Sequence, residues 1–267
     1  MVCCLEKTNS RDINPIHFVE SGTGFPVLLI HGLGVNGSSW QLQMDPLVNA
    51  GFHPIAIDVP GFGKSRFSGR RWNISVVSDI IADFIKNKIT VPCHLVGLSM
   101  GGALAQQLTL DHPEYFQKLV LVSTFSFLRP RKLIGWFYFL QRFMLVQVMG
   151  IGTQANFVAG RIFPGADQEI LRTEMIRQIN EADPHAYRAA MKSLAIFNSR
   201  KRLHEIKAPT LVISGEIDQT VPLSHQVELA RWIPGAEQVV IPKAGHAASV
   251  EKFQEFNEIL VDFLKKT

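Results

Sequence analysis

Residues 93–108 read CHLVGLSMGGALAQQL, in which a short apolar run leads into Gly97-Leu98-Ser99-Met100-Gly101. The run CHLVG predicts a buried strand, and Gly101–Asp111 predicts the helix that follows it. Glycines two positions either side of Ser99 permit the strained strand-to-helix turn that lifts a serine hydroxyl clear of the backbone. This context for G-x-S-x-G predicts a nucleophile at Ser99, the alternative being a glycine-rich connector with an incidental serine.

Short apolar runs of the same kind recur along the chain. Further strands are predicted at Pro26–Ile30, Ile55–Asp58, Lys118–Val122, Pro209–Ser214 and Glu237–Ile241. Helical spacing of apolar residues predicts helices at Val76–Lys88 and Val250–Lys266. In the second, the residues that recur at this spacing are Phe253, Phe256, Ile259, Leu260 and Phe263. Continuous apolar strands alternating with helices are typical of an α/β fold with a mostly parallel, doubly wound sheet.

The alternation stops in the middle of the chain. Residues 128–200 contain several helical stretches and no convincing strand. We therefore predict a core formed by residues 1–124 and 208–267, and a helical cap or lid, residues 125–207, inserted after the sixth strand. We call residues 125–207 the cap segment.

The net charge of +4 is unevenly distributed. The cap segment holds 13 Lys and Arg against 6 Asp and Glu, a net of +7, so the other 184 residues sum to −3. Such a distribution does not suit a nucleic-acid-binding protein. The basic cap segment could steer an acidic carrier protein or an anionic membrane surface, the alternative being a solvated helical surface. Its cations include Arg129, Arg131, Lys132, Arg142, Arg161, Arg172, Arg177, Arg200, Lys201 and Arg202.

Three cysteines, Cys3, Cys4 and Cys93, are too few for a disulfide framework and fit a reducing compartment. The first residues lack the apolar stretch of a secretory signal peptide. A cytoplasmic location is therefore expected, while the oligomeric state is left open.

A second glycine-rich loop, His31-Gly32-Leu33-Gly34, directly follows the predicted strand Pro26–Ile30. Its glycines let the backbone bend so that an amide faces the nucleophile. We predict that the backbone N–H groups of Leu33 and Met100 form an oxyanion hole, the latter at a helix N-terminus. The His31 side chain is interpreted as structural, although its place at a strand end makes it the strongest competitor for a catalytic base.

Five motifs in order resemble the α/β-hydrolase superfamily. They are HGLG at 31–34, DVPGFGKS at 58–65, GLSMGG at 97–102, GEIDQTVP at 215–222 and GH at 245–246. The chain is similar, more narrowly, to capped serine hydrolases: carboxylesterases, meta-cleavage carbon–carbon hydrolases and cofactor-free perhydrolase-like enzymes. The resemblance covers both core stretches, whereas residues 125–207 match no pattern of the family.

The resemblance implies a catalytic triad of Ser99, Asp218 and His246, in the chain order of this fold. Glu216, two residues before Asp218, is the competing acid. Four other histidines, His112, His185, His204 and His225, are expected to be solvated. Asp58 is interpreted as a turn former and loop organiser rather than a catalyst.

Two departures from related patterns are informative. Serine in place of aspartate at position 99 argues against the haloalkane dehalogenase and epoxide hydrolase branches. Phe253 stands where family members often have proline, which alters a helix start. The sequence contains no metal-ligand motif and no nucleotide-binding glycine loop, so neither a cofactor nor a metal is expected.

Residues 133–149, LIGWFYFLQRFMLVQVM, are apolar almost all round a predicted helix. Gln141 and Arg142 make it a poor membrane span. A buried cap helix that lines an acyl pocket and a lid at a membrane interface remain open. For the pocket we predict the side chains of Trp136, Phe137, Leu140 and Met144.

These features predict a serine hydrolase acting on a small-molecule carboxylic ester with a sizeable apolar acyl or alcohol part. The alternative within enzymes is carbon–carbon bond hydrolysis on the same triad, as in the meta-cleavage hydrolases that the chain resembles. The alternative outside enzymes is a hydrolase-fold ligand-binding protein with vestigial activity.

Overall fold

An eight-stranded sheet forms the centre of the molecule in a computed structural model that describes residues 5–8, 15–69, 71–89, 91–128 and 150–266. The strand order is β1-β2-β4-β3-β5-β6-β7-β8. The first two strands pair antiparallel and β2 is antiparallel to β4, whereas all other pairs are parallel. The strands are β1 (Leu5–Thr8), β2 (His17–Glu20), β3 (Phe25–Ile30), β4 (Phe52–Ile57), β5 (Cys93–Leu98), β6 (Phe116–Val122), β7 (Thr210–Gly215) and β8 (Glu237–Ile241).

The six strands predicted from apolar runs are β3 to β8, and the α/β-hydrolase fold is confirmed. Sequence reasoning missed β1 and β2 at the antiparallel edge. Neither strand has a long apolar run: β1 reads LEKT, and β2 contains only Phe18 and Val19 between polar residues. Of the two, only β1 is an edge strand, but antiparallel strands such as β1 and β2 need no continuous hydrophobic sequence.

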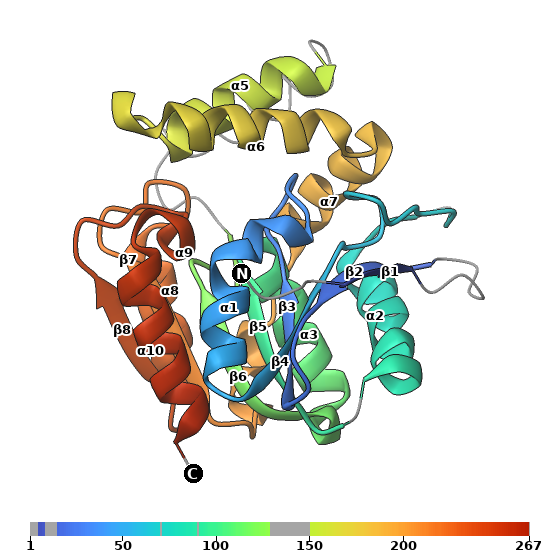
Figure 1. The fold of residues 1–267 in the computed structure, drawn as a ribbon, viewed down its shortest axis with the longest axis vertical. Coiled ribbons are helices and arrows are strands. Elements are labelled where there is room, and N and C mark those ends of the chain that lie inside the picture. The colour runs from blue at the N-terminus through green and yellow to red at the C-terminus, as the bar shows by residue number, and fades with distance from the viewer. Residues whose placement is uncertain (1–4, 9–14, 70, 90, 129–149, 267) are drawn as a thin grey trace.

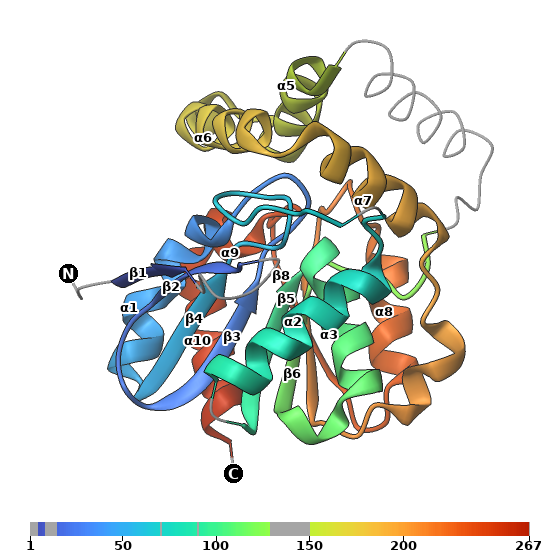
Figure 2. The same cartoon turned by 90° about the vertical axis from the view of Figure 1, so that its right-hand side faces the viewer.

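Helices cover both faces of the sheet (Figures 1 and 2). On one face α1 (Gln41–Asn49) and α10 (Phe253–Lys265) pack against Val27, Leu29 and their neighbours. On the other face lie α2 (Ile74–Lys88), α3 (Met100–Asp111) and α8 (Leu223–Trp232). Short helices are η1 (Gly37–Trp40), η2 (Pro113–Tyr115) and α9 (Ala248–Glu251).

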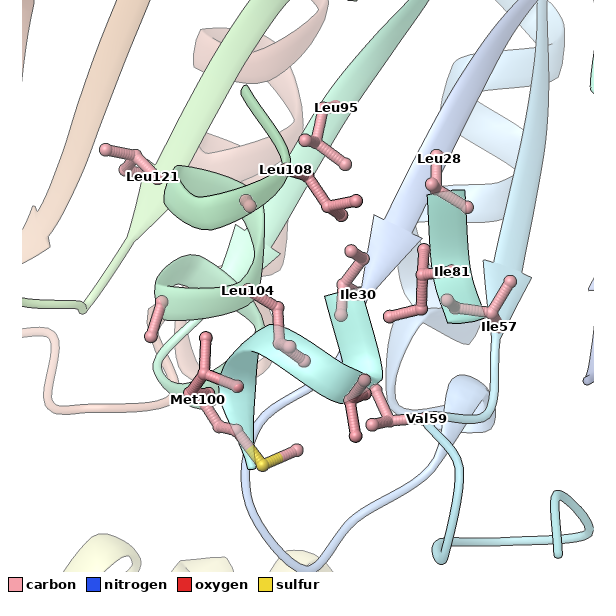
Figure 3. Packing of buried hydrophobic residues seen from close by; sticks show 14 of the residues in the cluster. Leu28, Ile30, Ile57, Val59, Ile81, Leu95, Met100, Leu104, Leu108 and Leu121 are labelled. Carbon is pink, nitrogen blue, oxygen red and sulfur yellow. The ribbon is translucent and has the colours of Figure 1, made fainter. Parts of the chain in front are cut away.

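Alternate residues of β3 illustrate why the strand sequences are apolar throughout. Leu28 and Ile30 belong to the cluster under α2 and α3, while Val27 and Leu29 belong to the cluster under α1 and α10. Figure 3 shows Ile30, Leu95 and Leu121 of the sheet near Leu104 and Leu108 of α3, and Leu28 beside Ile81 of α2. Full burial of such a side chain stabilises the fold by about 1.5–3 kcal/mol.

The C-terminal helix differs from the prediction of one helix over Val250–Lys266. The chain forms α9, turns at Lys252, and begins again as α10 at Phe253. Phe256, Leu260 and Phe263 are buried as predicted, but the Phe253 side chain is 40% exposed. As the first residue of α10, Phe253 lies before the buried stripe begins.

Apart from an isolated bridge between Asn198 and Phe127, the regular structure of residues 150–207 is helical. The helices are α5 (Gly150–Ile162), η4 (Ala166–Gln168), α6 (Glu169–Glu181), α7 (Pro184–Ile196) and η5 (Arg200–Glu205). In both views α5 and α6 lie above the sheet, and α7 leads back down toward it (Figures 1 and 2). The boundaries proposed for the cap segment and its separateness from the core stay predictions.

Trp136, Phe137, Leu140 and Met144, predicted for the pocket, lie outside the described residues, as does the helix predicted at 133–149. Within the described ranges, no helix is long and apolar enough to cross a membrane.

Candidate active site

Ser99 occupies the turn between β5 and α3 in a backbone conformation with a positive φ of 54°. Its N–H donates to the carbonyl of Val122 at 2.9 Å, and the hydroxyl of Thr124 donates to its carbonyl at 2.7 Å. Positive φ is strained for a non-glycine residue and persists where surrounding contacts hold it. The half-buried Ser99 side chain lines a cavity.

The glycines beside Ser99 are required by close backbone approach. A Cβ atom on Gly97 would lie 2.3 Å from the carbonyl oxygen of Gly101. One on Gly101 would lie 2.1 Å from the carbonyl oxygen of Ile30. Both distances are far below van der Waals contact, so the turn packs tightly against α3 and the end of β3.

Asp218 and His246 form a buried pair in the loops after β7 and β8. His246 Nδ1 lies 2.9 Å from Asp218 Oδ2, and the Asp218 side chain is 0% exposed. The other carboxylate oxygen accepts from the N–H groups of Thr220 at 2.8 Å and Val221 at 2.9 Å. A carboxylate held in this way fixes the tautomer of the imidazole and leaves Nε2 as the basic atom. His246 lines the same cavity as Ser99.

Glu216, the competing acid, lies elsewhere. It is exposed, and its Oε2 accepts from the N–H of Lys243 at 2.9 Å. Lys243 has a φ of 58°, so this contact supports a turn before the His246 loop. Asp218, and not Glu216, is the carboxylate bonded to the histidine.

A second carboxylate, which sequence reasoning missed, holds the backbone on both sides of His246. Glu251 accepts from the N–H of Gly245 at 2.9 Å and from that of Ala247 at 3.0 Å. Burial raises the pKa of Glu251, against the lowering effect of these two hydrogen bonds. Its position at the end of α9 fixes the loop that carries the histidine.

His31 has the structural role expected for it. Its Nδ1 lies 2.7 Å from the carbonyl oxygen of Gly32, and its Nε2 accepts from the N–H of Val59 at 2.9 Å. Both ring nitrogens are thus engaged, and burial lowers the pKa of the ring, so His31 is neutral. The ring joins the loop after β3 to the loop after β4.

Asp58 organises these loops, as predicted. One carboxylate oxygen accepts from the N–H of Gly37 at 2.7 Å. The other accepts from the N–H of Lys64 at 2.8 Å and lies 3.0 Å from Nδ1 of the buried His17. The pairing with His17, on the unpredicted strand β2, could not be read from the motif.

The amides predicted as an oxyanion hole belong to Leu33, which lines the cavity, and Met100, the first residue of α3. The Met100 side chain points into the core beside Leu104 (Figure 3), so only its backbone faces the turn. Within the described chain neither N–H donates a hydrogen bond to another residue. A Cβ atom on Gly32 would lie 3.7 Å from the Cβ of Ser99, which puts the two loops in contact.

The cavity has a volume of about 1030 Å³ and lies between the sheet and the helices of the cap segment. Apolar side chains dominate its wall, among them Leu42, Phe125, Val158, Ile162, Phe163, Leu171, Met175, Met191 and Leu194. Among the described residues of the wall, Arg161 is the only Lys or Arg and Glu174 the only carboxylate. His225, expected to be solvated, is only half-exposed and lines this wall, because α8 begins beside the Asp218 loop.

Several cations of the cap segment make local contacts. Arg177 pairs with Glu174 and Glu181, and Arg202 with Asp111 and Glu205. Arg172 donates to two carbonyl groups, of Phe163 and Gly165. The exposed ion pairs of Arg177 and Arg202 are typical of a solvated helical surface. Binding of an acidic carrier or an anionic membrane stays a prediction, since Arg129, Arg131, Lys132 and Arg142 lie outside the described residues.

Metal ligation has no evident site in the described ranges, where no group of three His, Cys, Asp or Glu side chains could hold an ion. Ser99 and His246 line the same cavity and His246 is bonded to Asp218, a set of groups that could serve nucleophilic catalysis.

Comparison with known proteins finds relatives along nearly the whole chain. A pimeloyl-(acyl-carrier protein) methyl ester esterase from Vibrio atlanticus is 28% identical over 94% of this chain and 98% of its own length. A 2-hydroxy-6-oxo-6-phenylhexa-2,4-dienoate hydrolase from Comamonas testosteroni is 30% identical over 97% and 95%. An esterase from Exiguobacterium antarcticum has the same fold, with a TM-score of 0.89, 22% identity and complete coverage of both chains.

The model of the alpha/beta hydrolase fold family matches residues 26–253. That range runs from β3 to the first residue of α10 and includes Ser99, Asp218 and His246. The chain therefore belongs to the alpha/beta hydrolase fold family.

Proposed function

We propose that this protein is a serine hydrolase that cleaves a carboxylic ester with a sizeable apolar acyl or alcohol part. The observation that carries the proposal is a single apolar cavity lined by both Ser99 and a histidine bonded to a buried carboxylate. An esterase among the relatives supports an ester as the substrate.

In the proposed reaction the oxygen of Ser99 attacks the ester carbonyl while His246 Nε2 takes the hydroxyl proton. Asp218 stabilises the imidazolium that forms, and the N–H groups of Leu33 and Met100 hold the oxyanion. The carbon–oxygen bond breaks, and His246 returns the proton to the leaving alcohol. Water then attacks the acyl-enzyme with the same proton transfers, releasing the acid and restoring Ser99.

The test is the Ser99→Ala variant, which should lose about 10⁴-fold or more in kcat while remaining folded. A fluorophosphonate should label the wild type stoichiometrically at Ser99 and leave the variant unlabelled. Labelling of another serine, or hydrolysis that survives the substitution, would contradict the proposal. Esters from acetate to decanoate, assayed together, would show whether activity rises with apolar chain length.

Carbon–carbon bond hydrolysis is the second candidate, because a cation lies in the cavity wall. Arg161 of α5 lines the cavity and donates through Nη2 to the carbonyl oxygen of Gln219, at 2.6 Å. A guanidinium there suits a substrate that carries a carboxylate, and a relative acts on such a dienoate. If this candidate is correct, Arg161→Gln should raise KM for a meta-cleavage dienoate and leave KM for a neutral ester unchanged.

A further inference from the structure

Gln226 of α8 is a buried polar residue at a position where packing requires only an apolar one. It lies one turn before Leu229 and two turns before Ile233, and all three side chains face the core. The Gln226 side chain is 0% exposed. Buried polar groups are usually explained by the hydrogen bonds that they make.

The side-chain amide of Gln226 reaches the carboxylate that holds His246. Its Nε2 lies 3.2 Å from Asp218 Oδ2, the same oxygen that accepts from His246 Nδ1 at 2.9 Å. The same Nε2 donates to the carbonyl of Val221 at 2.8 Å. Gln226 therefore ties both the Asp218 side chain and its backbone loop to helix α8.

The neighbours of this amide fix its orientation. Asp218 Oδ2 and the Val221 carbonyl are both acceptors, so the NH₂ group must face them. The amide oxygen then points the other way, and among the described residues it has no hydrogen-bond partner. A buried oxygen without a hydrogen-bond partner lowers the free energy of unfolding, whereas an apolar side chain at this position would carry no such penalty.

We propose that Gln226 is a positioning residue. It holds the Asp218 carboxylate in the orientation in which Oδ2 accepts the hydrogen bond from His246 Nδ1. Two backbone N–H groups hold Oδ1, and Gln226 holds Oδ2 beside the imidazole. Without it the carboxylate could turn about a torsion that is intrinsically broad. The inference rests on the proposed function, because it assigns Gln226 a role through Asp218 and His246.

The first experiment measures hydrolysis of 4-nitrophenyl butyrate by Gln226→Met, which keeps length and burial but removes the donor. We expect kcat to fall about 10- to 100-fold with KM within about twofold, and Tm to stay equal or rise. Gln226→Glu, near-identical in shape and lacking the donor when ionised, should lose at least as much. Leu229→Ala on the same helix is the matched control: it should lower Tm and leave kcat at 25 °C unchanged.

A second measurement does not depend on turnover. In the Ser99→Ala background, the low-field proton resonance of the His246–Asp218 hydrogen bond should shift or broaden in Gln226→Met and not in Leu229→Ala. A kcat for Gln226→Met within about twofold of wild type, or an unchanged resonance, would overturn the inference. Failure of the proposed function would show differently, as hydrolysis equal in the wild type and the Ser99→Ala variant.

Discussion

His94 should make the stability of this protein fall between pH 7.5 and pH 5. The side chain is 3% exposed on β5, packed against the rings of Phe25 and Phe52 at 4.6 and 5.7 Å between centroids. Its Nδ1 has no hydrogen-bond partner among the described residues. Burial, and secondarily the charge of Lys118 on the adjacent strand, lower the pKa of His94 from 6.5 to about 4.

Proton binding at His94 links the free energy of unfolding to pH. Between pH 4 and 6.5 the unfolded chain binds a proton at His94 that the folded chain excludes, so folding becomes less favourable as pH falls through this window. With pKa values of 6.5 unfolded and about 4 folded, the free energy of unfolding should drop by about 2 kcal/mol from pH 7.5 to pH 5.

Urea unfolding at the two pH values, with wild type and His94→Leu, tests this reasoning. The substitution shifts stability at both pH values through packing, so the informative quantity is the difference between them. That difference should shrink by about 2 kcal/mol in His94→Leu. The control His204→Gln removes an exposed histidine. In this variant the difference in the free energy of unfolding between the two pH values should equal that of the wild type, because His94 is still present. An equal pH-dependent loss in wild type and His94→Leu would refute the argument.

Two further substitutions test a contact at the end of α10, away from the site, and a contact that holds the His246 loop. Lys118→Met should lower the free energy of unfolding by about 2 kcal/mol in a urea titration, because the buried Nζ donates to the carbonyl groups of Phe263, Leu264 and Lys266 at the end of α10. A loss below about 0.5 kcal/mol would contradict this role. Glu251→Gln should lower kcat for 4-nitrophenyl butyrate about tenfold with KM little changed, because an amide can accept from only one of the two N–H groups that flank His246. Equal kcat in the two proteins would show that one of these hydrogen bonds suffices.

The central fold could be predicted because strands β3 to β7 are mostly buried on both faces. Runs such as VLLI in β3 and LVLV in β6 have a single physical explanation, a parallel sheet covered by helices. The elements that were missed lack this signal. Helix α1 contains Pro46, which sequence reasoning treats as a breaker, and β2 pairs antiparallel next to the sheet edge.

The residues assigned to chemistry could be named from motifs, but the contacts that position them could not. Asp218 and His246 were identified by their places after two strands, and the structure brings them together at 2.9 Å. Gln226 and Glu251 are polar residues of α8 and α9, and nothing in the sequences of these helices distinguishes them from other polar residues. Their roles depend on which side chain the fold turns inward, which no local pattern specifies.

The loop that carries Leu33 shows how the helices above the site share in holding it. Gln178 of α6 accepts from the N–H of Asn36 at 3.1 Å, and its amide donates to the hydroxyl of Ser38 at 3.2 Å. A Cβ atom on Gly34 would lie 2.8 Å from the ring of Tyr187 on α7, so the loop and this helix are in direct contact. The same loop is also bonded to the residues after β4, because His31 accepts from the N–H of Val59 and Asp58 accepts from the N–H of Gly37. A shift of α6 or α7 would therefore move the loop as well as the cavity wall, and substitutions in these helices should change kcat together with substrate preference.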